Sequence, residues 1–195
     1  MFVSIVWLIL AYLVGSFPFG LLIGQVFCRR DPRKFGSKNI GATNVCRVCG
    51  LKYGLLVLLL DVLKGFLPVY LATFFSDSVC FLSLTALACL LGHMYSVFLY
   101  GQGGKGVATT LGIGLALFPK PILLGVLVLI GALWWTGYMS VGSILFVGSL
   151  PFWLLLFDWK YVLLGIIIAI LVVYKHKSNI YRLILGEEKS WRKSN

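Results

Sequence analysis

Long apolar runs constrain this chain more than any other feature. Three of them, over residues 2–27, 53–75 and 79–100, are long enough for a helix rising about 1.5 Å per residue to cross the hydrocarbon core of a bilayer. Only 12% of the residues are charged, whereas a soluble domain carries about a quarter. Lipid must therefore surround most of the protein, which we expect to be an all-α polytopic membrane protein.

Four shorter apolar segments follow, at residues 107–118, 122–135, 139–157 and 161–174. They bring the expected total to about seven transmembrane helices, with six or five as alternatives, and the first of the four could be re-entrant. The first long run follows no basic residue, so we expect a retained span rather than a signal peptide. The sequence contains no internal repeat, and we expect a single membrane domain over residues 1–195.

The basic residues are unevenly distributed between the loops. Seven lie in the loop from Cys28 to Lys52, and six in the tail after Tyr174. Seven spans place both segments and Lys105 on one side, which the positive-inside rule makes cytoplasmic, with the N-terminus outside. The net charge of +11 therefore reflects topology and attraction to anionic lipid headgroups, and we expect no nucleic-acid binding.

The first basic loop has a pattern suited to binding an anion. Residues 35–47 read Phe-Gly-Ser-Lys-Asn-Ile-Gly-Ala-Thr-Asn-Val-Cys-Arg. Ser37 and Asn39 are good N-caps, and the N-terminus of a helix offers free N–H groups to a phosphate. A helix starting near Asn39 would put Asn39, Thr43 and Arg47 on one face. We interpret the loop as a phosphate cradle closed by Arg47; a well-capped surface turn is the alternative.

A second loop, at residues 101–106, surrounds Lys105 with glycines, including Gly103, Gly104 and Gly106. Glycines let backbone N–H groups point toward a ligand, and a lysine adds a point charge that suits phosphate. The loop is not a P-loop, because that motif needs Ser or Thr directly after the lysine. A flexible loop with an incidental lysine is the alternative reading.

Two histidines occur, in different settings. His93 lies alone near the end of an apolar segment, where a packed histidine is commoner than a catalytic one. His176 follows the last apolar segment, and Asn179 and Arg182 recur at intervals of three, so the three share a helical face. A histidine can exchange a proton near neutral pH, which suits general-base chemistry. A polar helix leaving the membrane is the alternative.

Two polar pairs lie within apolar segments. Asp61 and Lys64 are three residues apart in the second long run, and charges inside a membrane are usually paired or functional. A mutual salt bridge is the simplest account, with structural and functional roles both open. Ser140 and Ser143 also share a face, and they could contribute hydroxyls to a pocket or help helices pack.

Several kinds of chemistry are disfavoured by the sequence. The chain has no Gly-x-Ser-x-Gly, His-Glu-x-x-His or His-x4-Asp motif. Cys46-x-x-Cys49 has no second pair to complete a metal site, so no metal is expected. We read all the cysteines as ordinary small side chains that stay reduced in the cytosol. They are Cys28, Cys46, Cys49, Cys80 and Cys89.

The three polar segments together resemble the bacterial acyl-phosphate:glycerol-3-phosphate acyltransferases, the PlsY family. The likeness extends over essentially the whole chain. It rests on residues 36–47, on Gly92-His93 followed by residues 103–109, and on residues 176–183 with Gly186 and Glu187. Two positions depart from the family pattern: Lys38 replaces a usual glycine and Ser96 a common proline. These departures concern loop shape.

The resemblance implies a multi-pass enzyme of the bacterial inner membrane with its active site facing the cytoplasm. It would transfer a fatty acyl group from acyl phosphate to the 1-hydroxyl of sn-glycerol 3-phosphate, giving lysophosphatidic acid and phosphate, with membrane lipids around it. Acyl phosphate is already activated, so direct attack needs no acyl-enzyme, cofactor or metal. The resemblance also implies a loose contact with the enzyme that makes acyl phosphate.

The resemblance also implies roles for residues. The catalytic candidates are His176, Asn179, Lys105 and Arg47, and the base is either His176 or an oxygen of the departing phosphate. The substrate-binding candidates are Ser37, Asn39, Thr43, Asn44, His93, Gly103, Gly104, Gly106, Ser140, Ser143, Arg182 and Glu187. The alternative function is a transporter or flippase for an anionic phosphate compound, which predicts polar groups near the midplane and a path open to both sides.

Overall fold

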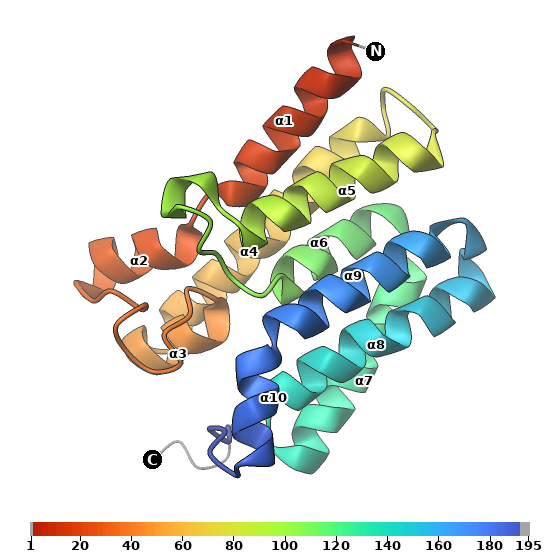
Figure 1. Ribbon diagram of the computed structural model, residues 1–195. Coiled ribbons are helices and arrows are strands. Elements are labelled where there is room, and N and C mark those ends of the chain that lie inside the picture. Colours follow the sequence, from red (N-terminus) through yellow and green to blue (C-terminus); the bar gives the residue numbers. More distant parts are fainter. Residues whose placement is uncertain (1, 192–195) are drawn as a thin grey trace. The chain divides into compact units, whose positions relative to one another are not determined.

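The computed structural model describes residues 2–191, and within that range every regular element is a helix. The expected all-α class is therefore confirmed (Figure 1). The chain forms two compact units, Met1–Leu117 and Phe118–Asn195. Each unit is described by itself.

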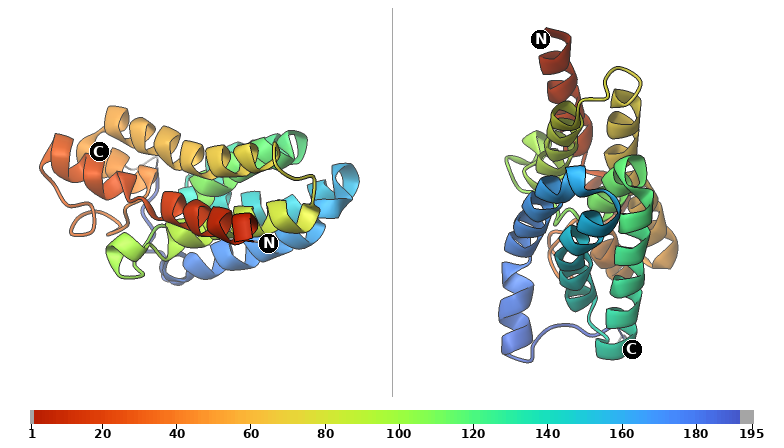
Figure 2. Two further views of the ribbon diagram at one scale, coloured as in Figure 1. Left: turned by 90° about the horizontal axis from the view of Figure 1, so that it is seen from above. Right: turned by 90° about the vertical axis from the view of Figure 1, so that its right-hand side faces the viewer.

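The first unit is built from helices that pack closely through glycine. Helix α1 runs along α5, and α4 runs along α6 (Figures 1 and 2). A Cβ on Gly15 of α1 would collide with the carbonyl of Cys89, and one on Gly112 of α6 would collide with that of Val62. Small residues at such crossings let membrane helices approach closely. The elements are α1 (Phe2–Ser16), α2 (Phe19–Cys28), α3 (Ala42–Cys49), α4 (Leu51–Ala72), α5 (Val79–Met94), η1 (Val97–Leu99) and α6 (Val107–Leu117).

The first apolar run is broken where a single segment was expected. Pro18 lacks an N–H and disfavours helical conformation at Phe17, so α1 ends at Ser16 and α2 begins at Phe19. Two side chains bind the carbonyls at the break. Ser96 Oγ donates to Ser16 O at 2.6 Å, and Lys64 Nζ donates to Phe17 O at 2.9 Å. A proline at position 96 could not make the first of these bonds.

The second unit begins at Pro119, which suits the first turn of α7 because its missing N–H would have had no helical partner. Gly137, with a φ of 77°, ends α7 in a left-handed cap. Helix α8 packs against both α7 and α9, and α10 leaves α9 at an angle of 57°. The elements are α7 (Pro119–Thr136), α8 (Met139–Phe157), η2 (Trp159–Tyr161), α9 (Val162–Lys175) and α10 (Lys177–Ile184).

Five helical stretches of the described chain are long and apolar enough to cross a membrane, and a sixth is added if the bent α9–α10 pair is one span. Helix α6, with 11 residues, is shorter than these. The expected segment at residues 139–157 matches α8 at both ends, and most other expected boundaries fall within a few residues of the observed ones. The count of seven spans and the orientation of the termini remain predictions.

Candidate active site

Asn44 organises the first basic loop. Its side chain is buried, and its Nδ2 lies within hydrogen-bonding distance of the carbonyls of Pro32 (2.8 Å), Phe35 (3.1 Å) and Asn39 (2.8 Å). Its Oδ1 accepts from the N–H of Ser37 at 2.7 Å. Asn44 therefore fixes the turn that carries the Ser37 hydroxyl, in keeping with the expected pocket-shaping role.

The turn also needs left-handed backbone at two positions. Gly36 has a φ of 64°, and a Cβ there would collide with Oδ1 of Asn44. Lys38 has a φ of 56°, a conformation that costs a residue with a Cβ about 1–2 kcal/mol relative to glycine. A glycine would adopt this conformation at position 38 without strain, and Lys38 makes the turn at some cost in stability.

Helix α3 begins at Ala42 rather than near Asn39, so the expectation that Ser37 or Asn39 caps it is wrong. Gly41 is the N-cap residue, so no side chain caps the N-terminus of α3. Asn39 lies outside the helix, where its Oδ1 accepts from the N–H of Gly41 at 2.8 Å in a local turn. Only Thr43 and Arg47 share a helical face as expected.

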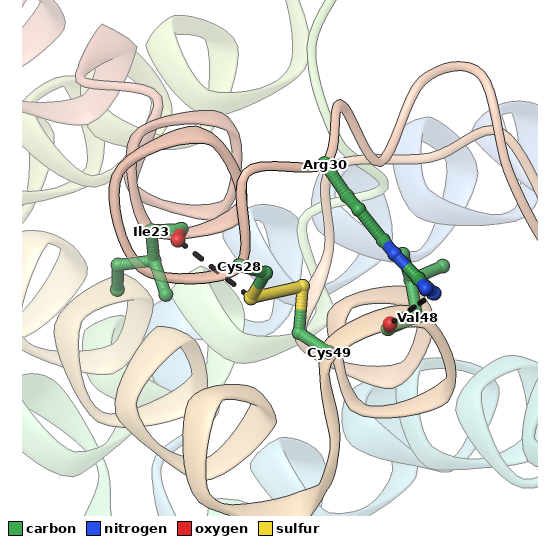
Figure 3. The surroundings of a disulfide bond; sticks show 5 residues. All are labelled: Ile23, Cys28, Arg30, Val48 and Cys49. Atoms are coloured by element: carbon green, nitrogen blue, oxygen red, sulfur yellow. Dashed lines mark hydrogen bonds between the residues drawn. A yellow bond between two sulfur atoms is a disulfide. The ribbon is translucent and has the colours of Figure 1, made fainter.

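A disulfide joins the two ends of this loop (Figure 3). Cys28 ends α2 and Cys49 ends α3, and their Cα atoms are 5.7 Å apart. Beside the bond, Arg30 Nη1 donates to the carbonyl of Val48 at 3.3 Å. The expectation of reduced thiols is wrong for this pair because α2 and α3 converge at their C-terminal ends. The free cysteines are Cys46, Cys80 and Cys89.

The glycine-rich loop rests on His93. The N–H of Gly104 donates to the carbonyl of His93 at 3.0 Å. This amide therefore does not point toward a phosphate, although the sequence suggested that it would. A Cβ on Gly104 would collide with the imidazole Nε2, and one on Gly103 would collide with the His93 carbonyl. Gly106, with a φ of 88°, then leads into α6. The turn places Lys105, which is partly exposed, directly before a helix N-terminus.

The first loop and η1, which precedes the glycine-rich loop, pack against the same helix. Leu21 of α2, Ile40 of the first loop and Leu99 of η1 form one buried cluster. A Cβ on Gly20 would collide with the carbonyl of Ile40, so the loop lies directly against α2. The first loop and the segment that leads into the glycine-rich loop therefore share one apolar support.

The expected ion pair inside the second long run is present. Asp61 Oδ1 and Lys64 Nζ are 2.8 Å apart, and each residue is 3% exposed. His93 Nδ1 lies 3.8 Å from the same carboxylate oxygen. The deep charges of the first unit thus form one buried group with His93.

In the second unit, a carboxylate that the sequence analysis missed holds two candidates together. Glu188 accepts from Asn179 Nδ2 at 2.6 Å and from Arg182 Nε at 2.7 Å. Burial raises the pKa of Glu188, but these hydrogen bonds, with a smaller contribution from the nearby Ser140 hydroxyl, outweigh it and hold the pKa below its usual value. Glu187, the residue expected to contribute, is exposed.

His176 lies buried at the junction of α9 and α10. Its Nδ1 is 2.7 Å from the carbonyl of Val172, and a carbonyl can only accept, so Nδ1 carries a proton. The basic nitrogen is then Nε2.

Ser143 Oγ donates to Met139 O of its own helix at 2.8 Å, which supports a packing role for Ser143.

The family model described as glycerol-3-phosphate acyltransferase matches residues 5–186. The chain belongs to the glycerol-3-phosphate acyltransferase family. The proposed phosphate cradle, the glycine-rich loop and His176, Asn179 and Arg182 all lie within the matched range, while Glu188 lies just beyond it.

Curated relatives carry the same description. The chain is 50% identical to a glycerol-3-phosphate acyltransferase of Nitratidesulfovibrio vulgaris over 97% of its length, but spans only 58% of that relative. It is 44% identical to one of Lawsonia intracellularis, covering 100% of this chain and 98% of the relative. It is 50% identical to one of Solidesulfovibrio magneticus, covering 96% and 94%.

Solved structures of a family member have the same fold. They are crystal structures of PlsY, an integral membrane glycerol 3-phosphate acyltransferase. The glycerol 3-phosphate form superposes with a TM-score of 0.91 at 42% identity, over 96% of this chain and 94% of that one. The lysophosphatidic acid form superposes with a TM-score of 0.89 at 40% identity, over 98% and 97%.

Proposed function

We propose that this chain acylates sn-glycerol 3-phosphate at its 1-hydroxyl, using acyl phosphate as donor and releasing lysophosphatidic acid and phosphate. The observation that carries the proposal is the likeness, over nearly the whole chain, to an enzyme solved with glycerol 3-phosphate and with lysophosphatidic acid. These two compounds are the acceptor and the product of such an acylation.

The reaction needs positioning rather than a protein nucleophile. Acyl phosphate is a mixed anhydride, so the acceptor hydroxyl oxygen can attack the acyl carbon as the acyl C–O bond to phosphate breaks. The electron pair of that bond leaves with phosphate, and the hydroxyl proton passes to a base. The tasks left to the protein are to hold two phosphates, stabilise developing charge and accept or guide one proton.

In the first unit we assign the phosphates to Ser37, Arg47 and Lys105. The N–H of Ser37 already donates to Asn44, so its hydroxyl is the group assigned to the ligand. Arg47 and Lys105 supply positive charge, which matches the negative charge common to both substrates. Thr43 shares the α3 face of Arg47 and would complete that side of the cradle.

In the second unit we assign the acceptor hydroxyl to His176 and Asn179. The Glu188 carboxylate can only accept hydrogen bonds, so the amide group of Asn179 must turn its Nδ2 toward Glu188. The Asn179 Oδ1 then points the other way and can accept a hydrogen bond. The proton goes to His176 Nε2 or to an oxygen of the departing phosphate. Either route is consistent with an imidazole whose Nδ1–H donates to the carbonyl of Val172.

We further propose one integral membrane acyltransferase domain over residues 1–195, since the family match continues across the boundary between the two units. We place the protein in the bacterial inner membrane, with the N-terminus outside and the C-terminus and active site facing the cytoplasm. The many basic residues of the first loop and the tail support this orientation. Acyl phosphate is labile and amphipathic, which supports a loose contact with the enzyme that supplies it.

The test is phosphate release by purified, detergent-solubilised protein given palmitoyl phosphate, without coenzyme A or added metal. We expect release that depends on glycerol 3-phosphate and is accompanied by an equal amount of lysophosphatidic acid. Folded protein that releases no phosphate in response to the acceptor would refute the proposal. A transporter for a phosphate compound would then be tested next, although the deep charges Asp61 and Lys64 pair with each other.

A further inference from the structure

The Asp61–Lys64 pair occupies a place where charge is expensive. Both residues are 3% exposed, on a helix that packs against α1, α5 and α6. A buried ion pair seldom adds stability over apolar residues of similar size, because the Coulombic gain only offsets the desolvation of two ions. Packing of α4 alone therefore does not account for these side chains, and their contacts indicate what they do.

The lysine end of the pair contacts the break between α1 and α2. Lys64 Nζ donates to the carbonyl of Phe17 at 2.9 Å and lies 5.7 Å from the centroid of the Phe19 ring. That carbonyl is outside α1, because the helix ends at Ser16. Lys64 is thus anchored by backbone, and its ammonium group in turn fixes the position of the Asp61 carboxylate.

The aspartate end of the pair faces His93. Asp61 Oδ1 is 2.8 Å from Lys64 Nζ and 3.8 Å from His93 Nδ1, so one oxygen lies between a cation and an imidazole edge. The longer distance exceeds that of a direct hydrogen bond, but the carboxylate still favours a ring orientation that presents Nδ1 to it.

The opposite edge of the imidazole supports the glycine-rich turn. Nε2 of His93 lies against Gly104 so closely that a Cβ there would collide with it. The carbonyl of His93 accepts from the N–H of Gly104 at 3.0 Å and leaves no room for a Cβ on Gly103. Ring and backbone of one buried histidine therefore define the surface on which Gly103 and Gly104 rest, immediately before Lys105.

We propose that Asp61, Lys64 and His93 form a positioning cluster that sets the geometry of the Gly103–Gly104 turn and, through it, the position of Lys105. The inference rests on the proposed phosphate-binding role of Lys105. His93, which is 4% exposed, acts through the turn rather than by touching substrate. The cluster controls where the Lys105 charge stands, and through it the affinity for a phosphate substrate.

The central test is the double variant Asp61→Asn/Lys64→Met, which removes both charges and leaves neither one unpaired. We expect its melting temperature to stay within about 3 °C of wild type. We expect KM for at least one of the two phosphate substrates to rise at least about tenfold, because small displacements of a binding group are costly. We expect kcat/KM to fall at least as much as KM rises, because Lys105 is also assigned to charge in the transition state. A double variant with wild-type KM for both substrates would overturn the proposal.

His93→Asn is the second variant, and it decides the question even if the charge variants do not fold. Asparagine can present its amide nitrogen toward Asp61 but lacks the ring edge that lies against Gly104. We expect the same rise in KM as in the double variant, and a folded His93→Asn protein with unchanged KM would refute the cluster. Thr85→Val is the matched control, since Thr85 is a buried polar residue of α5 whose hydroxyl donates to Phe81 O of its own helix.

Two readouts separate this proposal from the proposed function. Wild-type protein that shows no acceptor-dependent phosphate release refutes the acyltransferase reaction, whereas active wild type with an unchanged double variant refutes only the cluster. Calorimetric titration with glycerol 3-phosphate and with inorganic phosphate, without donor, measures binding directly. We expect the double variant and His93→Asn to bind at least one of them about tenfold more weakly, and equal binding of both ligands by wild type and both variants would overturn the cluster.

Discussion

At the scale of single residues, Lys105 is the side chain whose removal should affect the reaction most simply. It lies on a turn fixed by His93, so Lys105→Ala removes one positive charge without disturbing the support beneath it. If Lys105 stabilises charge in the transition state, kcat/KM should fall by roughly 10²–10³. Steady-state phosphate release measures this value, and near-normal turnover would show that the assignment is wrong. Lys105→Arg is the control for retained charge.

Glu188 gives a second residue-scale prediction. Glu188→Gln removes the negative charge that pairs with Arg182 and lets the Asn179 amide turn over, because a glutamine can also donate. We expect kcat/KM to fall at least about tenfold, since a hydrogen bond to a charged group is worth about 1.5–3 kcal/mol. Asp77→Asn, at an exposed carboxylate between α4 and α5 that belongs to no proposed site, is the control and should retain wild-type activity.

The depressed pKa of Glu188 also predicts a pH dependence of stability. Its folded pKa lies below the usual 4.5, so the unfolded chain binds the proton more tightly than the folded protein does. The stabilisation from Glu188 is therefore fully present above about pH 4.5 and is lost as the pH falls through the folded pKa. Melting temperatures from pH 7 to about 3 should fall less steeply for Glu188→Gln than for wild type. Parallel curves would contradict this.

The sequence predicted Asn179 and Arg182 on one face because helical spacing is local. It missed Glu188 because this residue lies beyond the end of α10, and Gly186, with a φ of 70°, turns the chain back there. Helical periodicity cannot extend through a left-handed turn. The signal that could have found it is a carboxylate two residues after such a glycine, following a helix whose arginine has no acidic residue three or four positions away.

At the scale of elements, the first loop is closed by a covalent bond that spacing alone did not predict. Cys28 and Cys49 are 21 residues apart, and a loop of this size implies a disulfide contribution of about 3 kcal/mol. Reduction, or Cys28→Ser, should lower the melting temperature by roughly 5–10 °C and raise KM for a phosphate substrate. Cys80→Ser, at an exposed free cysteine, is the control. A reduced protein with unchanged melting temperature and KM would contradict the prediction.

Element boundaries were predicted where a glycine or a charged residue interrupts an apolar run, and missed where the cause lies in backbone conformation or a local hydrogen bond. Helix α8 matches the expected range because Gly137 ends the preceding helix on one side and Asp158 ends the apolar run on the other. The break at Pro18 was missed because an apolar run continues through it. The start of α3 was missed because the Asn39 side chain bonds locally to Gly41 and delays the helix.

At the scale of the whole molecule, topology depends on the short helix α6. An 11-residue helix is about 16 Å long, roughly half of the hydrocarbon core. If α6 and its flanking residues cross the membrane, the six stretches that qualify become seven, and both basic segments lie on one side. If α6 is re-entrant, the number is even and the basic loop and basic tail are separated, against the positive-inside rule.

We therefore expect seven crossings, with the segment between α4 and α5 outside and the C-terminus in the cytoplasm. In intact cells a membrane-impermeant maleimide should label Cys80, which is free and exposed near the start of α5, and Cys80→Ser should abolish labelling. A C-terminal green fluorescent protein fusion should fluoresce. The fusion partner folds and becomes fluorescent in the cytoplasm, but it stays dark when the general secretory route exports it. Labelled Cys80 together with a dark fusion would mean an even number of crossings, with α6 re-entrant and the basic tail outside.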